Sequence, residues 1–517
     1  PPPPVMTLRH GYFSDQGYTH GAYPDISPER LVFAALLQSQ RPVDLAGAFS
    51  VLDLGCGQGF GLCLQAACYP QARFTGIDFS AAHIAHARAL AASAGLTNIQ
   101  FLTADFLNLS EAPPEGWGSF DFAIAHGILG WVSPEVGASL LAAAAAALRP
   151  GGLFYLSYNT LPGWLARQPF QHVVKSFQQN MGDGQPSLDA ALALFRQLQE
   201  SGSPLFQVQP SLAGSLDELS RQAPAYLLHE FNHAHWQPQY SDTVLRQAAA
   251  HELIYLVSAT LPESFDGLLP EAFRSVLSLC SEPDQHALVR DLLTNQSFRR
   301  DIYAKGRDPL WSAAASEAMQ KLELFSLLDD EDLLSPDAFS FRLGFGEVKG
   351  NRVWFLALME HLQQAPCRLG DLQRVPLLDD APTPLPELLQ NVALLLHKGS
   401  IALLPPPRDP APAQRFNQVV AAQVAAGAPY RAIAVPRSGN LLSLSDLELL
   451  LLHASLQGRS GDALIEALST NLESLGRSLQ HEGQPVEAAD RLERLTDHAT
   501  HFETATLPRL RRLEAVA

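Results

Sequence analysis

Short apolar runs alternate with helix-like stretches between residues 50 and 159. The apolar runs lie at Ser50–Leu54, Arg73–Asp78, Ile99–Asp105, Phe120–Ala125 and Gly152–Tyr158. Helices are expected between them at Phe60–Tyr69, Ala81–Ala94 and Pro134–Leu148. Because strands that alternate with helices usually pair in parallel, the pattern predicts an α/β fold, with a Rossmann-like parallel sheet covered by helices on both faces.

The pattern becomes mainly helical after Trp164. Helices are predicted at Leu165–Asn180, Ser187–Glu200, Leu216–Ala223 and Pro224–His235. Two later apolar runs, Leu253–Ser258 and Phe298–Tyr303, are interpreted as the last strands of the same sheet, with the helices inserted before them. A separate helical domain over residues 167–297 is the alternative, and the sequence leaves both arrangements open.

Proline- and aspartate-rich stretches divide the C-terminal half of the chain. Helices are predicted there at Arg352–Gln363, Leu385–His397 and Asp446–Leu456, and a wing or strand at Gly399–Leu404. Such helix–helix–strand units favour a mainly α, winged-helix-like C-terminal region. The expected organisation is an N-terminal arm (1–49), an α/β domain (50–305) with a helical insertion at about 165–250, a winged-helix-like middle domain (306–412) and a C-terminal helical domain (413–517).

A glycine-rich turn, Gly55-Cys56-Gly57-Gln58-Gly59, follows the first predicted strand. Glycines allow positive φ angles and let a ligand approach the backbone. The turn is expected at the carboxyl end of the sheet, where doubly wound folds bind ligands. Taken alone, it fits an NAD or FAD site as well.

Acidic residues at the ends of the first three strands favour S-adenosyl-L-methionine (SAM) instead. Asp53 suits the cationic aminoacyl end of SAM, Asp78 can accept hydrogen bonds from both ribose hydroxyls, and Asp105 can accept one from the adenine amino group. S-adenosylhomocysteine is then the expected product. The predicted cofactor residues are Asp53, Gly55, Cys56, Gly57, Asp78, Phe79, Asp105, Phe106 and His126.

Polar and aromatic residues after the fifth strand are candidates for handling a methyl acceptor. Tyr158 and Asn159 are expected to face the methyl group, and Trp164 to wall the same pocket. Tyr158 and His126 are the predicted catalytic residues, since a phenol can orient an amine and His126 is the base available for a hydroxyl. Core packing is an alternative for Trp164 and for His126.

Four sequence blocks resemble one known family. They are Gly17–Pro24 (GYTHGAYP), Ser157–Trp164 (SYNTLPGW), Tyr226–Glu230 (YLLHE) and Gln296–Arg300 (QSFRR). Over roughly residues 11–305 the chain resembles bacterial class I SAM-dependent methyltransferases that carry a methyltransferase regulatory domain. The resemblance implies a catalytic domain, an inserted helical regulatory segment and a C-terminal substrate-handling region. Some relatives are protein-lysine methyltransferases.

Lysine side chains of a protein or peptide are therefore the expected methyl acceptors. Aromatic faces attract an ammonium by cation–π contact, and Glu230 lies one helical turn from Tyr226. The predicted substrate-binding residues are Tyr18, Asn159, Trp164, Tyr226 and Glu230. An N- or O-methyltransferase of a small molecule or peptide natural product is the alternative, and a non-catalytic scaffold derived from such an enzyme is a third.

The stretch His229–His233 (HEFNH) matches the HExxH pattern of zinc peptidases. Pro238 ends the helix soon afterwards, and the stretch lies within the region of family resemblance, which accounts for His229 and Glu230 without zinc. A zinc peptidase is therefore a remote alternative, and no bound metal is expected.

The composition of the chain limits the classes of partner that are expected. The net charge is −18, without a dense run of Lys or Arg, so binding of nucleic acid through its phosphates is not expected. No stretch reaches the ~20 apolar residues of a membrane helix, and no secretory signal is recognised. The five cysteines form no CxxC pair, which fits a cytoplasmic protein. The oligomeric state is left open, with a homodimer as one option.

Overall fold

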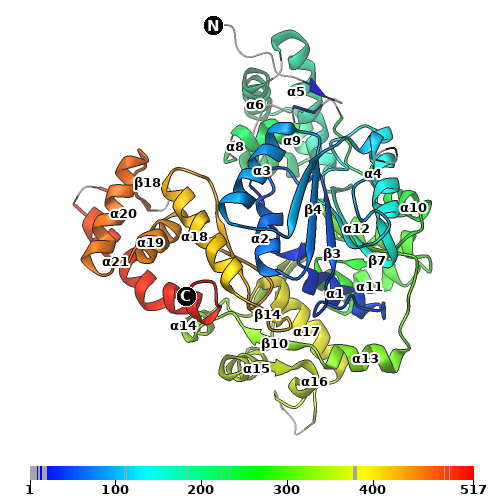
Figure 1. Cartoon of the computed structure of the whole chain (residues 1–517). Coiled ribbons are helices and arrows are strands. Elements are labelled where there is room, and N and C mark those ends of the chain that lie inside the picture. The colour runs from blue at the N-terminus through cyan, green and yellow to red at the C-terminus, as the bar shows by residue number, and fades with distance from the viewer. Residues whose placement is uncertain are drawn as a thin grey trace.

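The computed structural model describes most of the chain. The described residues are 8–9, 12–13, 20–109, 111, 113–182, 184–222, 224–231, 233, 235–375, 381–481, 484–487 and 489–517. Tyr18, predicted to bind substrate, lies outside them. The described chain forms a central sheet with helices on both faces, a helical cluster over one end of the sheet, and two smaller C-terminal units beside it and below it (Figure 1).

A seven-stranded sheet in the order β5-β4-β3-β6-β7-β9-β8 forms the centre. Its strands are β3 (Ser50–Leu54), β4 (Arg73–Asp78), β5 (Ile99–Thr103), β6 (Phe120–Ala125), β7 (Leu148–Asn159), β8 (Leu253–Ser258) and β9 (Phe298–Lys305). The first five run parallel, and β9 pairs antiparallel with both β7 and β8. The predicted α/β class is confirmed, and so is the assignment of the last two strands to the same sheet.

Side chains that alternate along the strands build a core on each face of the sheet. Val51 packs with the core on one face and its neighbour Leu52 with the core on the other. The helices that supply the first core are α1 (Pro28–Leu37), α2 (Phe60–Cys68) and α3 (Ala81–Ser93), and those that supply the second are α4 (Pro134–Ala147), α10 (Ser241–Ala249) and α12 (Pro283–Thr294).

The helical insertion between β7 and α10 covers the carboxyl ends of the parallel strands (Figure 1). Its helices are α5 (Gln168–Met181), α6 (Gln185–Glu200), α7 (Pro204–Val208), α8 (Ser211–Ser220) and α9 (Pro224–Phe231). They share a core of their own, which includes Trp164. Helix α9 ends earlier than predicted, and the chain then returns to the end of β7, where the Gln239 N–H donates to the Asn159 carbonyl (3.0 Å).

The middle of the C-terminal half combines helices with a small three-stranded sheet in the order β13-β10-β14, and its winged-helix-like character stays a prediction. Its main elements are α13 (Ser312–Gln320), β10 (Glu323–Ser326), α15 (Arg352–Gln364), β13 (Cys367–Arg368), α16 (Leu369–Leu372), α17 (Leu385–Lys398) and β14 (Ile401–Leu404). The hairpin of β11 (Ser340–Leu343) and β12 (Gly346–Lys349) lies beside them.

The last unit is mainly helical and packs against α2 (Figure 1). Its main elements are α18 (Ala411–Ala425), β15 (Ala432–Val435), β16 (Asn440–Ser443), α19 (Asp446–Leu456), α20 (Asp462–Ser474), α21 (Arg491–His501) and α22 (Leu507–Arg512). Buried side chains of this unit belong to the same continuous core as α1, α2 and α3. The unit is therefore an integral part of the fold.

A buried ion pair joins the two halves of the chain. Arg408 donates to Glu29 (2.9 Å) and to the Cys68 carbonyl (3.1 Å), and its guanidinium lies 3.9 Å from the ring centre of Tyr69. Both charged side chains are only 6% exposed. Burial raises the pKa of Glu29 to about 7, against the opposing effect of Arg408.

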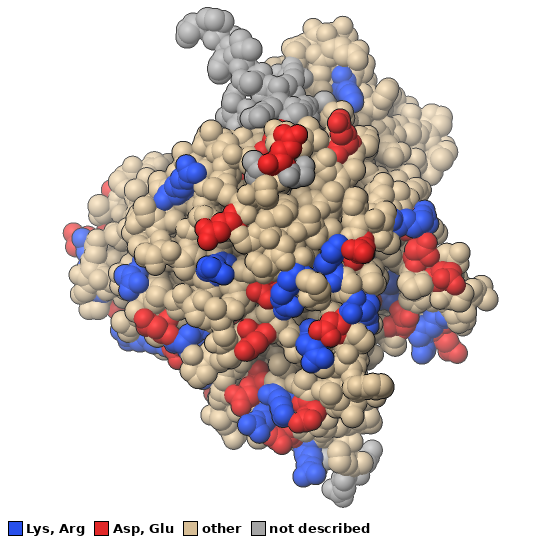
Figure 2. Space-filling model, turned by 45° about the vertical axis from the view of Figure 1, so that its right-hand side comes forward, with Lys and Arg blue, Asp and Glu red and all other residues tan. Residues whose placement is uncertain are grey.

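The distribution of surface charge and the apolar character of the helices both concern what the protein can bind. In the face drawn in Figure 2, acidic and basic side chains are interspersed, and neither sign forms a continuous patch. In the part of the chain that the structure describes, no helix combines the length and the apolar character that crossing a membrane requires.

Removing the Arg408 side chain should strongly destabilise the fold. In Arg408→Ala the Glu29 carboxyl stays buried without its cation, which costs about 3–5 kcal/mol. Urea unfolding measures this loss, and replacing both partners (Glu29→Leu with Arg408→Met) should recover most of it. Lys321→Ala, which breaks an exposed pair with Glu317, is the control and should leave the midpoint unchanged. An equal midpoint for Arg408→Ala and the wild type would contradict the analysis.

Candidate functional site

Three adjoining cavities lie at the carboxyl ends of the parallel strands. The sheet-end pocket is lined by residues that include Gly57, Asp78, Asp105, Phe106 and Glu230. The arm pocket lies beneath the N-terminal segment and includes His20, Tyr23, Asp53, Cys56 and Gly57. The outer cleft, of about 640 Å³, opens toward the helical insertion and includes Asn159, Trp164, Arg167, Tyr226 and Glu230. His126 lines all three cavities, so they meet around this residue.

The glycine turn forms the floor between the first two pockets. Hydrogen bonds from the Gly55 and Cys56 N–H groups to the Ile77 carbonyl (2.8 and 3.0 Å) fix the turn against β4. Gly55 and Gly57 have φ angles of 85° and 54°, which favour glycine. A Cβ on Gly55 would lie 2.5 Å from Ile128, whereas a Cβ on Gly57 would meet nothing within 4 Å. The open side of Gly57 therefore leaves room for a ligand.

Asp78 is held rigidly at the end of β4. One carboxylate oxygen accepts from the Gly57 N–H (3.0 Å) and the other from the Ser80 N–H (2.8 Å). The side chain is 6% exposed and borders the sheet-end pocket. Each oxygen keeps a second lone pair, so the carboxylate can still accept from a bound hydroxyl.

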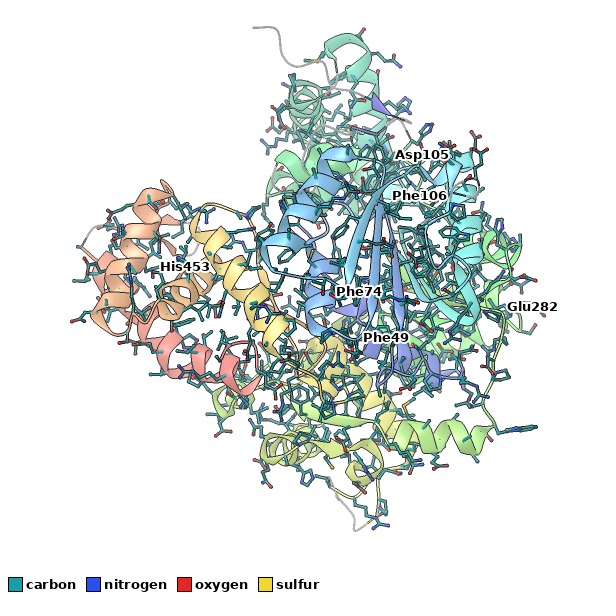
Figure 3. All side chains as sticks on the ribbon, in the orientation of Figure 1. Phe49, Phe74, Asp105, Phe106, Glu282 and His453 are labelled. Atoms are coloured by element: carbon teal, nitrogen blue, oxygen red, sulfur yellow. The ribbon has the colours of Figure 1, made fainter. Side chains whose placement is uncertain are left out.

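Asp105, Phe79 and Phe106 lie in the same pocket. Asp105 accepts from the Leu107 N–H (3.1 Å) and so begins a short 3₁₀ turn over residues 106–108. Figure 3 places Asp105 and Phe106 together at the insertion end of the sheet, while Phe74 lies toward the opposite end. The structure thus brings the predicted adenine-binding residues to the pocket that Asp78 borders.

Asp53 lies in the arm pocket beside Cys56. Burial, together with the negative charge of Asp78, raises the pKa of Asp53 to about 7. A carboxyl group of this kind is ready to ionise when a cation binds next to it. Burial also raises the pKa of the Cys56 thiol, so Cys56 contributes a neutral side chain.

His126 follows β6 and is fixed by neighbours from two other elements. Its Nδ1 lies 3.1 Å from the Tyr155 hydroxyl and 3.0 Å from the Ser157 hydroxyl, and its ring stacks on Tyr23 at 3.7 Å between centroids. Burial, with the nearby positive charge of Arg300, lowers the pKa of His126 to about 3. The ring is therefore neutral at physiological pH.

Glu230 lies on the wall that the sheet-end pocket and the outer cleft share. It is 6% exposed, and its carboxylate accepts hydrogen bonds from Asn159 (3.0 Å) and Tyr226. Burial raises its pKa to about 8, although Arg167 and these hydrogen bonds oppose the shift. Tyr226 is 37% exposed and stands at the mouth of the cleft. The structure thus joins three of the predicted substrate residues in one hydrogen-bonded group.

Trp164 and Arg167 also line the outer cleft. The Trp164 indole donates to the Ser297 carbonyl (2.7 Å), and the Arg167 guanidinium lies 4.7 Å from the ring centre. Arg167 also pairs with Glu218 (2.6 Å). Trp164 therefore packs in the core of the insertion and also lines the cleft.

The expectation that Tyr158 faces the methyl group is wrong. Its side chain is fully buried on the opposite side of β7, and its hydroxyl donates to Asp301 (2.8 Å). The alternation of side chains along a strand turns Tyr155, Ser157 and Asn159 toward the site instead. Alternation along the predicted strand shows that Tyr158 and Asn159 cannot face the same way, but it does not say which of the two faces the site.

The HExxH stretch is described only in part. Asn232 and the side chain of His229 lie outside the described residues. The His233 ring packs edge-on against Trp131 at 5.3 Å and borders the sheet-end pocket. Among the residues that the structure describes, no group of three His, Cys, Asp or Glu side chains is placed to hold a metal ion.

Comparison with known proteins agrees with this site. Residues 51–152 match a family model described as a methyltransferase domain, and residues 223–305 match one described as a predicted methyltransferase regulatory domain. An uncharacterized protein of Synechocystis sp. is 31% identical over 520 residues, which cover 98% of this chain and 99% of the relative. Trans-aconitate 2-methyltransferase of Methylobacterium nodulans is 36% identical over 130 residues, 25% of this chain and 45% of that protein.

A solved structure shares the whole fold. PKMT2 from Rickettsia typhi in complex with AdoHcy superposes with a TM-score of 0.68, covering 96% of this chain and 99% of that chain at 19% sequence identity. The full-length relative, the two family models and the seven-stranded sheet all lead to one assignment. The chain belongs to the class I SAM-dependent methyltransferases that carry a methyltransferase regulatory domain.

Proposed function

We propose that this enzyme transfers the methyl group of SAM to the side-chain amine of a lysine in a protein or peptide. The observation that carries the proposal is Glu230, a buried carboxyl group with its pKa near 8, on the wall between the sheet-end pocket and the outer cleft. A group in this place can receive the proton that an incoming ammonium must lose before it reacts.

The two inner pockets fit SAM. Asp53 would hold the aminoacyl ammonium, Asp78 the ribose hydroxyls and Asp105 the adenine, above the open side of Gly57. Phe79 and Phe106 offer apolar faces for the base. When bound, SAM supplies a methyl group activated by its sulfonium.

The outer cleft prepares the amine. The ring of Tyr226 attracts an ammonium, at ~0.5–2 kcal/mol for the contact, while Trp164, whose ring already carries the Arg167 guanidinium, lines the cleft. Deprotonating a free lysine at pH 7 costs about 4–5 kcal/mol, and burial beside these rings lowers that cost. Glu230 accepts the proton, while Asn159 holds the carboxylate in place.

Charge in the cleft argues against an anionic acceptor. Glu218 and Glu230 both line it, and the Arg167 guanidinium is already paired with Glu218. An acceptor carboxylate, such as the substrate named for the trans-aconitate relatives, would therefore meet the acid Glu218 and an arginine that is already paired, while Glu230, mostly protonated at pH 7, supplies no positive charge. A PKMT structure with the same overall fold supports a protein acceptor.

The first test of the site is SAM affinity in Asp78→Ala. Removing the acceptor of the ribose hydroxyls should weaken binding by about 1.5–3 kcal/mol, or roughly 10- to 150-fold. Calorimetric titration measures the Kd. Asp121→Ala is the matched control, since Asp121 is also a hydrogen-bonded carboxylate but lies at the start of β6 (2.9 Å from the Ser50 nitrogen), away from the pockets. Wild-type affinity in Asp78→Ala would remove Asp78 from the cofactor site.

Asp53 should make SAM binding depend on pH. Its pKa is about 7 without a ligand, and a bound ammonium favours the ionised form, so protonation below pH 7 competes with binding. The Kd should rise as pH falls from 7 toward 5.5, by at most about tenfold per pH unit. Asp53→Asn should bind more weakly and lose this slope. If the Kd of Asp53→Asn still depends on pH in the same way, the dependence belongs to another group.

Glu230→Gln should lower kcat by about 10²–10⁴-fold with SAM affinity nearly unchanged. In the wild type, the rate should increase as pH rises through about 8, because the ionised carboxylate is the proton acceptor. The defect of Glu230→Gln should shrink at higher pH, where more of the amine is already neutral. The assay follows tritium from SAM into an acceptor found in cell extract.

Glu218→Gln is the matched control, since Glu218 lines the same cleft but is exposed and paired with Arg167. Its kcat should stay within a few-fold of the wild type. Mass spectrometry of the labelled product locates the methyl group. A methyl on oxygen or carbon, or equal rates for both variants, would overturn the lysine proposal.

A further inference from the structure

The C-terminal unit forms part of the wall behind the arm pocket. Tyr430 precedes β15 and is 2% exposed, although it belongs to a different unit from the sheet. Its ring stacks on Phe60 at 4.4 Å with an interplanar angle of 8°, and His20 meets it edge-on at 5.1 Å. Phe60 begins α2 directly after the glycine turn, and His20 lines the arm pocket.

A chain of hydrogen bonds leads from Tyr430 into the glycine turn. The Tyr430 hydroxyl lies 3.1 Å from His86 Nε2, and His86 Nδ1 lies 2.9 Å from the Gln58 carbonyl. A carbonyl only accepts, so Nδ1 carries the proton, and in the neutral imidazole Nε2 accepts from Tyr430. Gln58 stands between Gly57 and Gly59, and it lines the arm pocket itself. The hydroxyl of Tyr430 thus fixes the backbone of the turn through one intermediary.

The same unit holds the N-terminal segment over the pocket. The Asn440 amide at the start of β16 donates to the Pro24 carbonyl (3.1 Å) and to the Ser27 hydroxyl (3.0 Å). The preceding residue, Tyr23, stacks on His126. A Cβ on Gly61 would lie 3.0 Å from the Gly21 carbonyl, so the segment rests directly on α2. Residues 20–27 are therefore held between His126, α2 and the antiparallel hairpin of β15 and β16, called the C-terminal hairpin.

We propose that Tyr430 is a positioning residue for the cofactor, through which the C-terminal unit sets the affinity of the arm pocket for SAM. The proposal rests on the assignment of the inner pockets to SAM. Tyr430 acts through His86 and Gln58 on the turn, and through His20 on the segment above it. Because linkage is reciprocal, SAM binding should in turn stabilise the contact of the C-terminal unit with α2.

The test compares Tyr430→Phe with the wild type in the full chain. The variant keeps the ring stacked on Phe60 and removes only the hydroxyl, so the fold is retained. The Kd for S-adenosylhomocysteine and the KM for SAM should rise about three- to tenfold, as for the loss of one hydrogen bond, while kcat at saturating SAM stays within twofold. If the role of Tyr430 were purely structural, Tyr430→Phe would lower the thermal midpoint without raising Kd and KM relative to kcat.

Leu468→Ala is the control, because Leu468 is fully buried in α20, on the far side of the C-terminal unit from α2 (Figure 1). It should lower the thermal midpoint and leave the Kd unchanged. Hydrogen exchange of residues 430–443 should slow when S-adenosylhomocysteine binds to the wild type, and less so in Tyr430→Phe.

Wild-type affinity in Tyr430→Phe, or equal weakening in Leu468→Ala, would overturn the positioning role. If the wild-type protein fails to bind S-adenosylhomocysteine, the proposed cofactor site itself is wrong. This outcome differs from a failure of the role proposed for Tyr430, in which the wild type binds normally.

Discussion

The hydrogen bond from the Gly57 N–H to the Asp78 carboxylate connects the ends of β3 and β4, on which the site is built. It fixes the turn after β3 to the end of β4, so that the open side of Gly57 and the free lone pairs of Asp78 border the same pocket. Parallel pairing of β3 and β4 brings these residues together, and the positive φ angles of Gly55 and Gly57 let the chain turn without a clash. The remaining elements enclose this corner.

Much of the sheet and of the cofactor site could be predicted because the signals are local. Asp53, Asp78 and Asp105 lie within two residues of the ends of β3, β4 and β5, and in a parallel sheet such ends converge at one edge. The prediction for Tyr158 is wrong because it lets two successive residues at the end of a strand, Tyr158 and Asn159, point to the same side. A strand has two faces, and only the partners across the sheet, His126 and Asp301, show which face Tyr158 takes.

The contacts that close the site are long-range in sequence, and no local pattern marks them. Tyr430 and His86 are 344 positions apart, and Asn440 and Pro24 are 416 apart. Helix and strand periodicity describes each element separately, so it predicted α19 but neither α18 nor the packing of α18 on α2. The buried carboxyls show the same limit, since the raised pKa values of Asp53 and Glu230 come from burial that only the folded chain creates.

The residues around the arm pocket come from distant parts of the sequence, and this has a consequence for synthesis of the protein. The sheet is complete once β9 has been made at Lys305, but Tyr430 and Asn440 follow much later. At ~5–20 residues per second, a ribosome needs about 7–27 s to pass from the end of β9 to Asn440. During that interval the residues of the sheet and the glycine turn have been made, but the segment around Tyr23 and the core beside α2 still lack the side chains of the C-terminal unit. The order of translation therefore delays a fully walled site until the C-terminal hairpin has emerged.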